Sequence, residues 1–493
     1  LDSRGRSRRC CLHGRCPERQ RGASPAGWRR PAPATGNPWG KAQEVPGTAA
    51  LNTGRAGISS VSCASAGNCS AGGVYASGYY QDGTEIFQAF VVSEVHGTWR
   101  KAEEVPGTAA LNTGGNAGIT SVSCASAGNC SAGGVYASGY YARGTELSQA
   151  FVVSEVHGTW RKAEEVSGTA ALSKGGVAQI TSVSCASAGN CSAGGWYSGV
   201  GIGREAFVVS EVHGTWRKAE EVPGIAALNT GGNAEVLSVS CASAGNCSAG
   251  GWHSGAGIGR EAFVVSEVHG TWRKAEEVPG TAALNEDGLA TTTSVSCALA
   301  GNCSAGGYYQ DGSHVTRAFV VSEVHGTWRK AEEVPGTAAH GMGRGAQITS
   351  VSCASAGHCT AGGAYADGPL STRAFVVSEI HGTWRKAEEV PGIAALSKGR
   401  PHAAAITSVS CASAGNCSAG GFYQDGSHAT QAFVVSEVHG TWRRAEEVPG
   451  TTALSKGRGA EITSVSCASA GHCSAGGDYL VKSGAEAFVV SRK

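Results

Sequence analysis

The stretch TWRKAEEVPGTAALNTGGNAGITSVSCASAGNCSAGGVY, residues 98–136, recurs along the chain together with a second block, QAFVVSEVHG, residues 149–158. A segment of variable sequence separates the two blocks in every copy. Successive copies lie 56 to 61 residues apart, and a period of this length is the signature of a repeat architecture such as a solenoid or a propeller. One tryptophan marks each of the eight copies: Trp39, Trp99, Trp160, Trp216, Trp272, Trp328, Trp384 and Trp442.

Each repeat is predicted to contain four strands, because apolar residues alternate with Ser, Thr and Gly at a period of two. In the second repeat the strands are expected at 119–126, 130–136, 149–156 and 159–166. The links from first to second and from third to fourth strand are short, whereas the other two links are long. Four-stranded antiparallel units repeated radially form a β-propeller, for which four to eight blades are typical.

The residue composition of the strands predicts their order from the propeller axis outward. The first two strands are built of Ser, Ala, Gly and Cys, which fit where sheets crowd together, so we expect them nearest the axis. The fourth strand carries Arg, Lys, two Glu and a closing Pro, and such residues protect an exposed edge from pairing with another chain. We therefore expect it at the outside, with paired Glu such as Glu103 and Glu104 as solvated edge charges.

The two ends of the repeat region complement each other. The region begins with a lone fourth strand at 37–45 and ends with a first, second and third strand within 462–491. An open solenoid would gain nothing from this arrangement and would need polar caps instead. The sequence therefore predicts an all-β, eight-bladed propeller over 37–493 whose last blade is closed by the N-terminal strand. A solenoid and other all-β arrangements are the alternatives.

The turn between the third and fourth strands contains a histidine in seven copies. In the second repeat, His157-Gly158 fits a two-residue hairpin that requires positive φ at both positions, and His is among the residues enriched there. On separate blades these histidines should stand more than about 10 Å apart, too far to share a zinc ion. We therefore expect no metal and no cofactor. The turn histidines are His96, His157, His213, His269, His325, His381 and His439.

Every repeat also carries two cysteines with five residues between them, one on each side of the turn between its first two strands. Closing so short a loop would stabilise the fold by roughly 2 kcal/mol per bridge. Structural zinc needs four ligands per site, whereas each hairpin offers two, so we predict disulfides, with free thiols and metal as alternatives. The predicted pairs are Cys63–Cys69, Cys124–Cys130, Cys185–Cys191, Cys241–Cys247, Cys297–Cys303, Cys353–Cys359, Cys411–Cys417 and Cys467–Cys473. We accordingly expect a secreted or cell-surface protein.

Composition narrows the class of protein. The chain is 41% hydrophobic and 16% charged, too apolar for a disordered protein, and it has no apolar run long enough to span a membrane. Lys and Arg number 39 against 38 Asp and Glu, so charge gives no reason to expect nucleic acid or an anionic membrane as a partner. We expect a monomer.

Residues 1–36 differ in kind from the repeats. They hold nine Arg against Asp2 and Glu18, and they contain Cys10, Cys11 and Cys16. No apolar stretch in them is long enough for a signal-peptide core. We expect a disordered basic leader or an artefact of the sequence, with a solvated linker or a binding tail as alternatives.

The repeat SVSCASAGNCSAGG, with AFVVSExxGTW after it, resembles repeats of uncharacterised, mostly secreted bacterial β-propeller-like proteins over about 37–493. This resemblance implies an architecture and says almost nothing about activity. A second resemblance is to the Asp-box hairpin of sialidase-type propellers, S-x-D-x-G-x-T-W, at the turn between the third and fourth strands. The stretch SEVHGTW at 93–99 is one residue shorter and has Val95 where the box has Asp.

The eight copies differ mainly at one end of the strands, in the loops from second to third and from fourth to first strand. Loops on a rigid scaffold are where binding specificity is built, although unconstrained loops also drift. Aromatic and acidic residues at that end are our candidates for ligand binding: Tyr79, Tyr80, Asp82, Trp196, Trp252, Tyr308, Asp311, Phe422, Asp425 and Asp478. The aromatic after Ala-Gly-Gly, Tyr75 in the first repeat and His253 in the fourth, is interpreted as core, with a ligand platform as the alternative.

An enzyme needs one unique constellation, whereas eight similar repeats supply eight copies of each group. The inner strands hold no Ser/His/Asp grouping, and their one singular acid is Asp478. The leading hypothesis is a non-catalytic extracellular propeller that binds a glycan or a protein through its variable face. A sialidase-like glycan-processing enzyme with a degenerate frame and a structural spacer are the alternatives.

Overall fold

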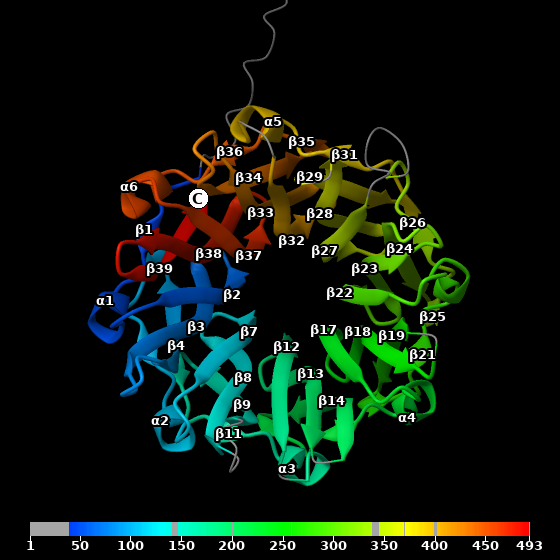
Figure 1. The fold of residues 1–493 in the computed structure, drawn as a ribbon, viewed down its shortest axis with the longest axis horizontal. Coiled ribbons are helices and arrows are strands. Elements are labelled where there is room, and N and C mark those ends of the chain that lie inside the picture. The colour runs from blue at the N-terminus through cyan, green and yellow to red at the C-terminus, as the bar shows by residue number, and fades with distance from the viewer. Residues whose placement is uncertain are drawn as a thin grey trace, which may run out of the picture. The chain divides into compact units, whose positions relative to one another are not determined.

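The computed structural model describes residues 39–492, except 141–145, 175, 200, 258, 338–344, 369 and 399–401. In these residues, eight antiparallel sheets stand around an axis and form a closed eight-bladed β-propeller (Figure 1). The predicted fold class is therefore confirmed. The expectation for residues 1–36 lies outside the described part of the chain.

Blades 1 to 4 follow one another along the chain, each from its inner strand outward. Blade 1 contains β2 (Ala56–Ser65), β3 (Asn68–Tyr79), β4 (Glu85–Val95), β5 (Thr98–Trp99) and β6 (Glu103–Glu104). Blade 2 contains β7 (Ala117–Ser126), β8 (Asn129–Tyr140), β9 (Glu146–Val156), β10 (Thr159–Trp160) and β11 (Glu164–Glu165). Blade 3 contains β12 (Val177–Ser187), β13 (Asn190–Gly199), β14 (Ile202–Val212), β15 (Thr215–Trp216) and β16 (Glu220–Glu221). Blade 4 contains β17 (Ala234–Ser243), β18 (Asn246–Gly255), β19 (Gly259–Val268), β20 (Thr271–Trp272) and β21 (Glu276–Glu277).

Blades 5 to 8 repeat this order. Blade 5 contains β22 (Thr291–Leu299), β23 (Asn302–Gln310), β24 (Thr316–Val324), β25 (Thr327–Trp328) and β26 (Glu332–Glu333). Blade 6 contains β27 (Ala346–Ser355), β28 (His358–Gly368), β29 (Ser371–Ile380), β30 (Thr383–Trp384) and β31 (Glu388–Glu389). Blade 7 contains β32 (Ala404–Ser413), β33 (Asn416–Gln424), β34 (Thr430–Val438), β35 (Thr441–Trp442) and β36 (Glu446–Glu447). Blade 8 contains β37 (Ala460–Ser469), β38 (His472–Val481), β39 (Gly484–Arg492) and the N-terminal β1 (Gln43–Glu44).

The outermost strand differs from the prediction. In blade 2 it consists of the two short strands β10 and β11, not one strand at 159–166, and both pair with β9. Between them the N–H of Ala163 donates to the carbonyl oxygen of Pro106 in the preceding blade, at 2.7 Å. The equivalent bond recurs at the other outer strands. The pairing of the outer strand with its own sheet is therefore interrupted where its backbone bonds to the neighbouring blade.

Short helices, which the sequence analysis did not predict, follow the outer strands at the rim of the ring (Figure 1). Each begins after a glycine in the left-handed region, such as Gly47 at φ 91°. Where the first residue is Thr, as Thr48 in α1, its hydroxyl donates to the carbonyl three residues before, that of Val45 at 2.8 Å, whereas α4 and α5 begin with Ile. A Thr side chain that bonds backward in this way closes a turn locally. The helices are α1 (Thr48–Leu51), α2 (Thr108–Leu111), α3 (Thr169–Leu172), α4 (Ile225–Leu228), α5 (Ile393–Leu396), α6 (Thr451–Ser455) and the 3₁₀ turn η1 (Thr281–Ala283).

The two-residue turns have the predicted conformation. His157 has φ 52° and Gly158 has φ 78°, and the other six turn histidines have φ of 49° to 54°. Each turn also bonds to the turn between the first two strands of its own blade: the N–H of His157 donates to Asn129 Oδ1 at 3.3 Å. The constant turns therefore lie together at one end of each blade, and the variable loops lie at the other.

The hydrophobic core lies between blades. The cluster between blades 1 and 2 joins Val91 of one blade to Ile119 and Phe151 of the next. Equivalent clusters fill the other seven junctions, and the phenylalanine of the third strand is fully buried in every blade. Each blade is therefore stabilised by its neighbours, as expected for a repeat whose units cannot bury a core alone.

The aromatic after Ala-Gly-Gly belongs to this core, which confirms the preferred interpretation. Tyr75 is buried, and its hydroxyl donates to Glu104 Oε2 at 2.7 Å. Burial, together with this carboxylate, raises the pKa of the phenol well above its usual value. The prediction that both paired Glu are solvated edge charges is therefore wrong for the second of them. Seven such pairs occur: Tyr75–Glu104, Tyr136–Glu165, Tyr197–Glu221, Tyr309–Glu333, Tyr365–Glu389, Tyr423–Glu447 and Tyr479–Glu44.

Serine side chains join the inner strands of adjacent blades. The hydroxyls of Ser60 and Ser62 in β2 accept hydrogen bonds from the backbone N–H groups of Val122 and Cys124 in β7, at 3.0 and 2.9 Å. Equivalent pairs link every inner strand to the next one. The ring closes in the same way, because Ser464 and Ser466 of blade 8 accept from Val61 and Cys63 of blade 1, both at 2.9 Å.

The N-terminal strand completes the eighth blade, as predicted. β1 pairs antiparallel with β39, and Trp39 bridges to Arg492. Trp39 packs into the core between blades 7 and 8, and Val45 packs into the core between blades 8 and 1. The first described residues therefore contribute to two of the eight inter-blade cores.

All eight predicted disulfides are present. Each joins directly opposed residues of the two innermost strands, such as Cys63 and Cys69. This number of cross-links indicates an extracellular or otherwise oxidising environment.

Truncation of Trp39 tests the closure. Because this side chain is only 4% exposed within the core of the last junction, Trp39→Ala should lower the free energy of unfolding by about 3–5 kcal/mol. Lys41→Ala, at an exposed position on the same segment, serves as the control and should change it by less than about 0.5 kcal/mol. Denaturant unfolding measures both, and equal effects of the two variants would show that the N-terminal strand does not seal the ring.

Candidate functional site

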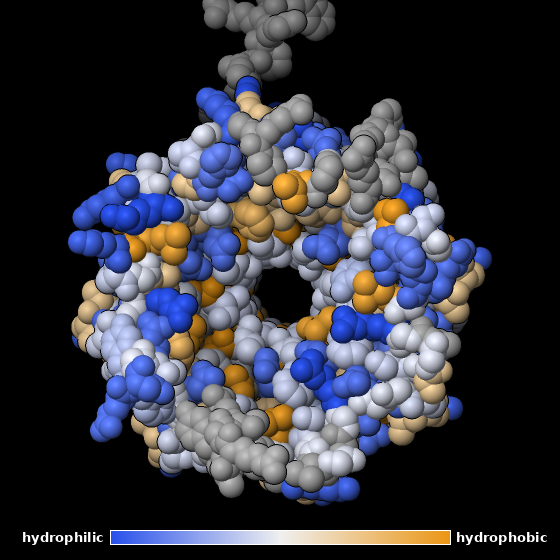
Figure 2. Space-filling view, in the orientation of Figure 1, coloured by the Kyte–Doolittle hydropathy of each residue, from blue (hydrophilic) through white to orange (hydrophobic). Residues whose placement is uncertain are grey.

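Five of the ten predicted ligand-binding residues share one register position, on the second strand of their blades near its variable end. Across the strand pair, this residue faces the start of the inner strand, as Asp478 faces Glu461. Its side chain also lies between blades, since a Cβ at Gly57 of blade 1 would stand 3.6 Å from the Cβ of Asp478 of blade 8. We call this position the rim ring: Val74, Val135, Trp196, Trp252, Tyr308, Ala364, Phe422 and Asp478. Figure 2 shows the open channel at the centre of the propeller that these inner strands surround.

The rim ring is asymmetric. Blades 1 and 2 carry Val at this position and blade 8 carries Asp478. Blades 3, 5 and 7 carry half-buried aromatic side chains, and Trp252 of blade 4 is buried. The guanidinium of Arg204 lies 4.1 Å from the ring centroid of Trp196, and that of Arg260 lies 3.9 Å from the ring centroid of Trp252. Arg204 also forms an ion pair with Glu235 at 2.8 Å. Blades 3 and 4 therefore carry two arginines stacked on tryptophans at adjacent positions.

Asp478 and Glu461 form a pair of carboxyl groups in blade 8. They face each other across β37 and β38. Burial, and then the charge of Glu461, raises the pKa of Asp478 to about 6, and burial also raises the pKa of Glu461. Two neighbouring carboxyl groups with raised pKa values can share one proton near neutral pH.

The other five predicted residues lie at the end of β3, where Tyr79 is, or in loops of blades 1, 5 and 7, and their hydrogen bonds hold those loops. Tyr80 donates to the carbonyl of Gly114 at 2.6 Å, and the hydroxyl of Tyr79 donates to that of Thr53 at 3.3 Å. Asp82 accepts from the N–H of Thr84 at 2.9 Å. Asp311 accepts from Arg317 Nε at 2.8 Å, and Asp425 accepts from Gln431 Nε2 at 3.0 Å. The structure does not bring these residues into one site with the rim ring.

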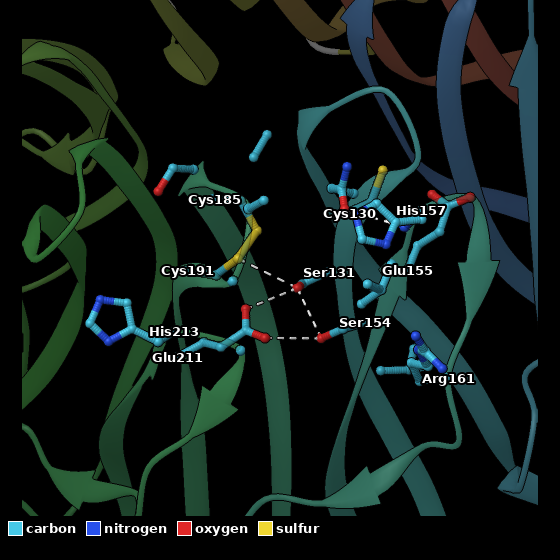
Figure 3. Close-up of a pocket in the computed structure, with 18 of the residues that line it drawn as sticks. Cys130, Ser131, Ser154, Glu155, His157, Arg161, Cys185, Cys191, Glu211 and His213 are labelled. Atoms are coloured by element: carbon cyan, nitrogen blue, oxygen red, sulfur yellow. Dashed lines mark hydrogen bonds between the residues drawn. A yellow bond between two sulfur atoms is a disulfide. The ribbon is translucent and has the colours of Figure 1, made fainter.

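A buried carboxylate at the blade junctions was missed by the sequence analysis. Figure 3 shows Glu211 of blade 3 between two serines of blade 2: Ser131 and Ser154 donate to its two carboxylate oxygens, each at 3.2 Å. Burial raises the pKa of Glu211, and the two serine hydrogen bonds oppose this shift. The same triad occurs at six junctions, around Glu94, Glu155, Glu211, Glu267, Glu323 and Glu379. The available signal was the Glu of SEV together with the Ser of CSA in successive repeats.

The junction between blades 6 and 7 departs from this pattern. Blade 6 has Thr360 where the other blades have Ser, and the Thr hydroxyl lies 3.4 Å from Cys417 Sγ. Glu437, the corresponding carboxylate, is 5% exposed, and its Oε2 atom has no hydrogen-bond partner. Burial, and then the charge of Glu388, raises the pKa of Glu437 to about 7.

Above four of the triads, between blades 1 and 2, 2 and 3, 4 and 5, and 5 and 6, adjacent blades leave a cleft at the end of the constant turns. The cleft between blades 2 and 3 has a volume of about 450 Å³, and His157 and His213 stand on its two sides (Figure 3). Arg161 and the Cys185–Cys191 disulfide also line it. The sequence analysis placed binding at the opposite, variable face, where no single residue set repeats.

Two further features limit the chemistry of the described residues. They contain no group of three or more His, Cys, Asp or Glu arranged to hold a metal ion. No helix among them is long and apolar enough to cross a membrane.

Comparisons with known proteins assign no family to the chain. No protein-family model matches it, and no curated protein matches it. Solved structures similar to it include the fucose-specific lectin of Aleuria aurantia, with 12% identity, 68% of this chain and 96% of that chain covered, and a TM-score of 0.31. The sialidase of Trypanosoma rangeli in complex with sialic acid has 10% identity, coverage of 84% and 56%, and a TM-score of 0.36. An ulvan lyase has 8% identity, coverage of 74% and 90%, and a TM-score of 0.40.

Restoring the missing serine tests the junction triad. Thr360→Ser should allow two hydroxyls to bond to Glu437, and should stabilise the fold by about 1.5–3 kcal/mol at pH 8. Because the folded-state pKa of Glu437 is about 7, above its unfolded value, the parent loses stability as pH rises from about 4.5 to 7. The gain should therefore nearly vanish at pH 4, as measured by denaturant unfolding at both pH values.

Ser304→Thr is the matched variant, because it places the same defect beneath Glu379. It should destabilise the protein at pH 8 and much less at pH 4. A gain or loss that is the same at both pH values would show that the carboxylate is not the group affected.

Proposed function

We infer that this protein is a non-catalytic binding propeller that recognises a glycan across its rim ring. The observation that carries this inference is the asymmetry of the ring, because the neighbouring strand positions repeat almost unchanged from blade to blade. Trp196, Trp252 and Tyr308 follow one another in blades 3 to 5, whereas the same position is Val in blades 1 and 2. Aromatic side chains beside charged groups are the usual means by which a pocket orients a ligand.

Positively and negatively charged groups lie on different blades of the rim ring. Arg260 stacks on Trp252 and forms no ion pair within the described part of the chain, so its guanidinium can pair with a ligand carboxylate. Asp478 and Glu461 of blade 8 can accept hydrogen bonds from sugar hydroxyls. A glycan that carries an acidic sugar at one end fits this separation of positive and negative groups.

Replacement of one guanidinium tests the proposal. On an array of acidic glycans and their carboxyl-reduced counterparts, the parent protein should bind a restricted set more tightly when the carboxylate is present. Arg260→Gln should weaken that binding about tenfold or more, because one charged hydrogen bond is lost. Arg444→Gln, at an exposed position on the outer edge of blade 7 and outside the lining of the described clefts, is the control and should leave it unchanged.

Binding to no glycan on the array would contradict the proposal and would leave a structural spacer or a protein ligand. A protein ligand would still require Arg260 in a pull-down from the fluid in which the protein occurs. Equal loss of binding in both arginine variants would show that the rim ring is not the site.

The carboxyl pair of blade 8 favours one second candidate, an enzyme acting on glycans. Glycoside hydrolysis uses two carboxyl groups, one of them a general acid with a raised pKa. Asp478 has a pKa of about 6 beside Glu461 and would serve as that acid.

Fluorogenic glycosides, including a sialoside, test this candidate. If it is correct, the protein hydrolyses at least one of them, and Asp478→Asn lowers kcat by two or more orders of magnitude. Glu461→Gln should have a similar effect. Hydrolysis that survives both substitutions would exclude the pair as the catalytic groups, and no hydrolysis by the parent would favour the binding function.

A further inference from the structure

The clefts at the constant-turn end form a second set of cavities, separate from the rim ring. The cleft between blades 2 and 3 has a volume of about 450 Å³, within the range of roughly 300–1,000 Å³ found for small-molecule sites. Its counterparts between blades 4 and 5, 5 and 6, and 1 and 2 measure about 470, 400 and 260 Å³. We call them the turn-face clefts.

Every turn-face cleft has at least one turn histidine and one triad carboxylate in its lining, whereas an arginine and a lysine line the clefts between blades 2 and 3, 4 and 5, and 5 and 6 but not the cleft between blades 1 and 2. The cleft between blades 2 and 3 shows the fuller set. One wall carries His157, Arg161 and Lys162 of blade 2, and the other carries the Cys185–Cys191 disulfide and His213 of blade 3. The base holds Glu211, whose two oxygens are occupied by Ser131 and Ser154. The clefts between blades 4 and 5 and between blades 5 and 6 also have a tryptophan in their lining, Trp328 and Trp384.

Several of these side chains have hydrogen-bonding capacity to spare. His157 and His213 use their backbone N–H groups in the turns, while their imidazoles make no hydrogen bond within the described residues. Both residues are exposed, and the positive φ of each turn keeps its imidazole at the cleft. The guanidinium of Arg161 likewise has no ion pair in the described part of the chain.

The charges of the cleft select against simple ions. Arg161 and Lys162 would repel a cation, whereas Glu155, Glu164 and Glu211 would repel an anion. The carboxylates outnumber the cationic groups by three to two, so a polyanion gains no net attraction, and the described residues contain no group of three or more His, Cys, Asp or Glu arranged to hold a metal cation. A neutral ligand with many hydroxyl groups can both donate to the carboxylates and accept from the cations and imidazoles.

We propose that each of the three turn-face clefts lined by an arginine and a lysine binds one unit of a neutral, polyhydroxylated sugar, which makes the propeller multivalent for densely displayed glycans. The Cys185–Cys191 disulfide lines the cleft between blades 2 and 3, but Val153 and the tryptophans of the other two clefts are buried, so polar groups supply most of the contacts with the sugar. A single open cleft binds weakly, but several on one rigid ring bind a glycan-coated surface together, and linked binding can raise the apparent affinity by 10²–10⁴. This inference is independent of the function proposed for the rim ring.

Stoichiometry gives the first test. Native mass spectrometry of the full chain with excess methyl glycosides of neutral hexoses should detect three or more sugars bound to one chain. Albumin conjugates bearing the same hexoses should bind at least about 100-fold more tightly than the free glycosides in surface plasmon resonance. One sugar or none per chain, or equal affinities for conjugate and free glycoside, would overturn the proposal.

Variants locate the site. Arg→Gln at all seven equivalent positions (Arg100, Arg161, Arg217, Arg273, Arg329, Arg385 and Arg443) should abolish conjugate binding, whereas Arg161→Gln alone should weaken it less than fivefold. Arg260→Gln at the rim ring should not change it, so failure of this proposal and failure of the rim-ring function remain distinguishable. Unchanged binding in the sevenfold variant would overturn the proposal.

A second set of variants controls for a loss of binding that results from misfolding. His→Asn at the seven turn positions retains a residue that accepts positive φ and removes the imidazole. These variants should keep the thermal midpoint of the parent within a few degrees and lose conjugate binding. Retained binding, or a preference for sulfated over neutral conjugates, would contradict the assignment.

Discussion

The hydrogen bonds from inner-strand N–H groups to the serines of the preceding blade are the constraint on which the rest of the structure depends. An inner strand has a sheet on one side only, so its free edge would otherwise leave backbone groups unpaired in a crowded interior. At the free edge of β7, the backbone N–H groups donate to the hydroxyls of Ser60 and Ser62 in the preceding blade. The same pair of bonds recurs at each junction. Because every inner strand needs acceptors from a preceding blade, the first inner strand needs them too. The N–H groups of Val61 and Cys63 find these acceptors in blade 8, and these bonds close the ring.

This requirement explains why the repeats vary so unevenly. The inner strands must keep Ser at two positions and small residues around them: a Cβ at Gly73 would stand 1.9 Å from the carbonyl oxygen of Gly57. The constant turns are held by positive φ and by bonds between them. Only the opposite end of the blades is free to differ, and there Trp196, Trp252 and Asp478 give the ring its asymmetry. The constant end repeats one cleft, so the two faces suit different kinds of binding: one asymmetric site, and several equal ones.

Most of the fold could be predicted because its signals are local or recur at a fixed period. The alternation of residues, the His157-Gly158 turn and the cysteine spacing each define a contact within one blade, and the leftover strands at the two ends define the closure. What could not be predicted depends on contacts between blades. Ser131 looked like a small spacer because its partner, Glu211, lies 80 residues away in the next blade, and Glu104 looked solvated because Tyr75 reaches it from within the sheet. The rim-ring residues share one position in the repeat, directly after Ala-Gly-Gly, but only the structure shows that Trp196 and Trp252 carry stacked arginines and that Asp478 faces Glu461.

Native-state hydrogen exchange at the closing junction tests this account most directly. If serine hydroxyls seal the ring, the amides of Val61 and Cys63 exchange as slowly as those of Val122 and Cys124, which occupy the same positions one blade later. Fast exchange at Val61 and Cys63, with protection retained at Val122 and Cys124, would show that the first and last blades are not joined and would contradict the closed ring.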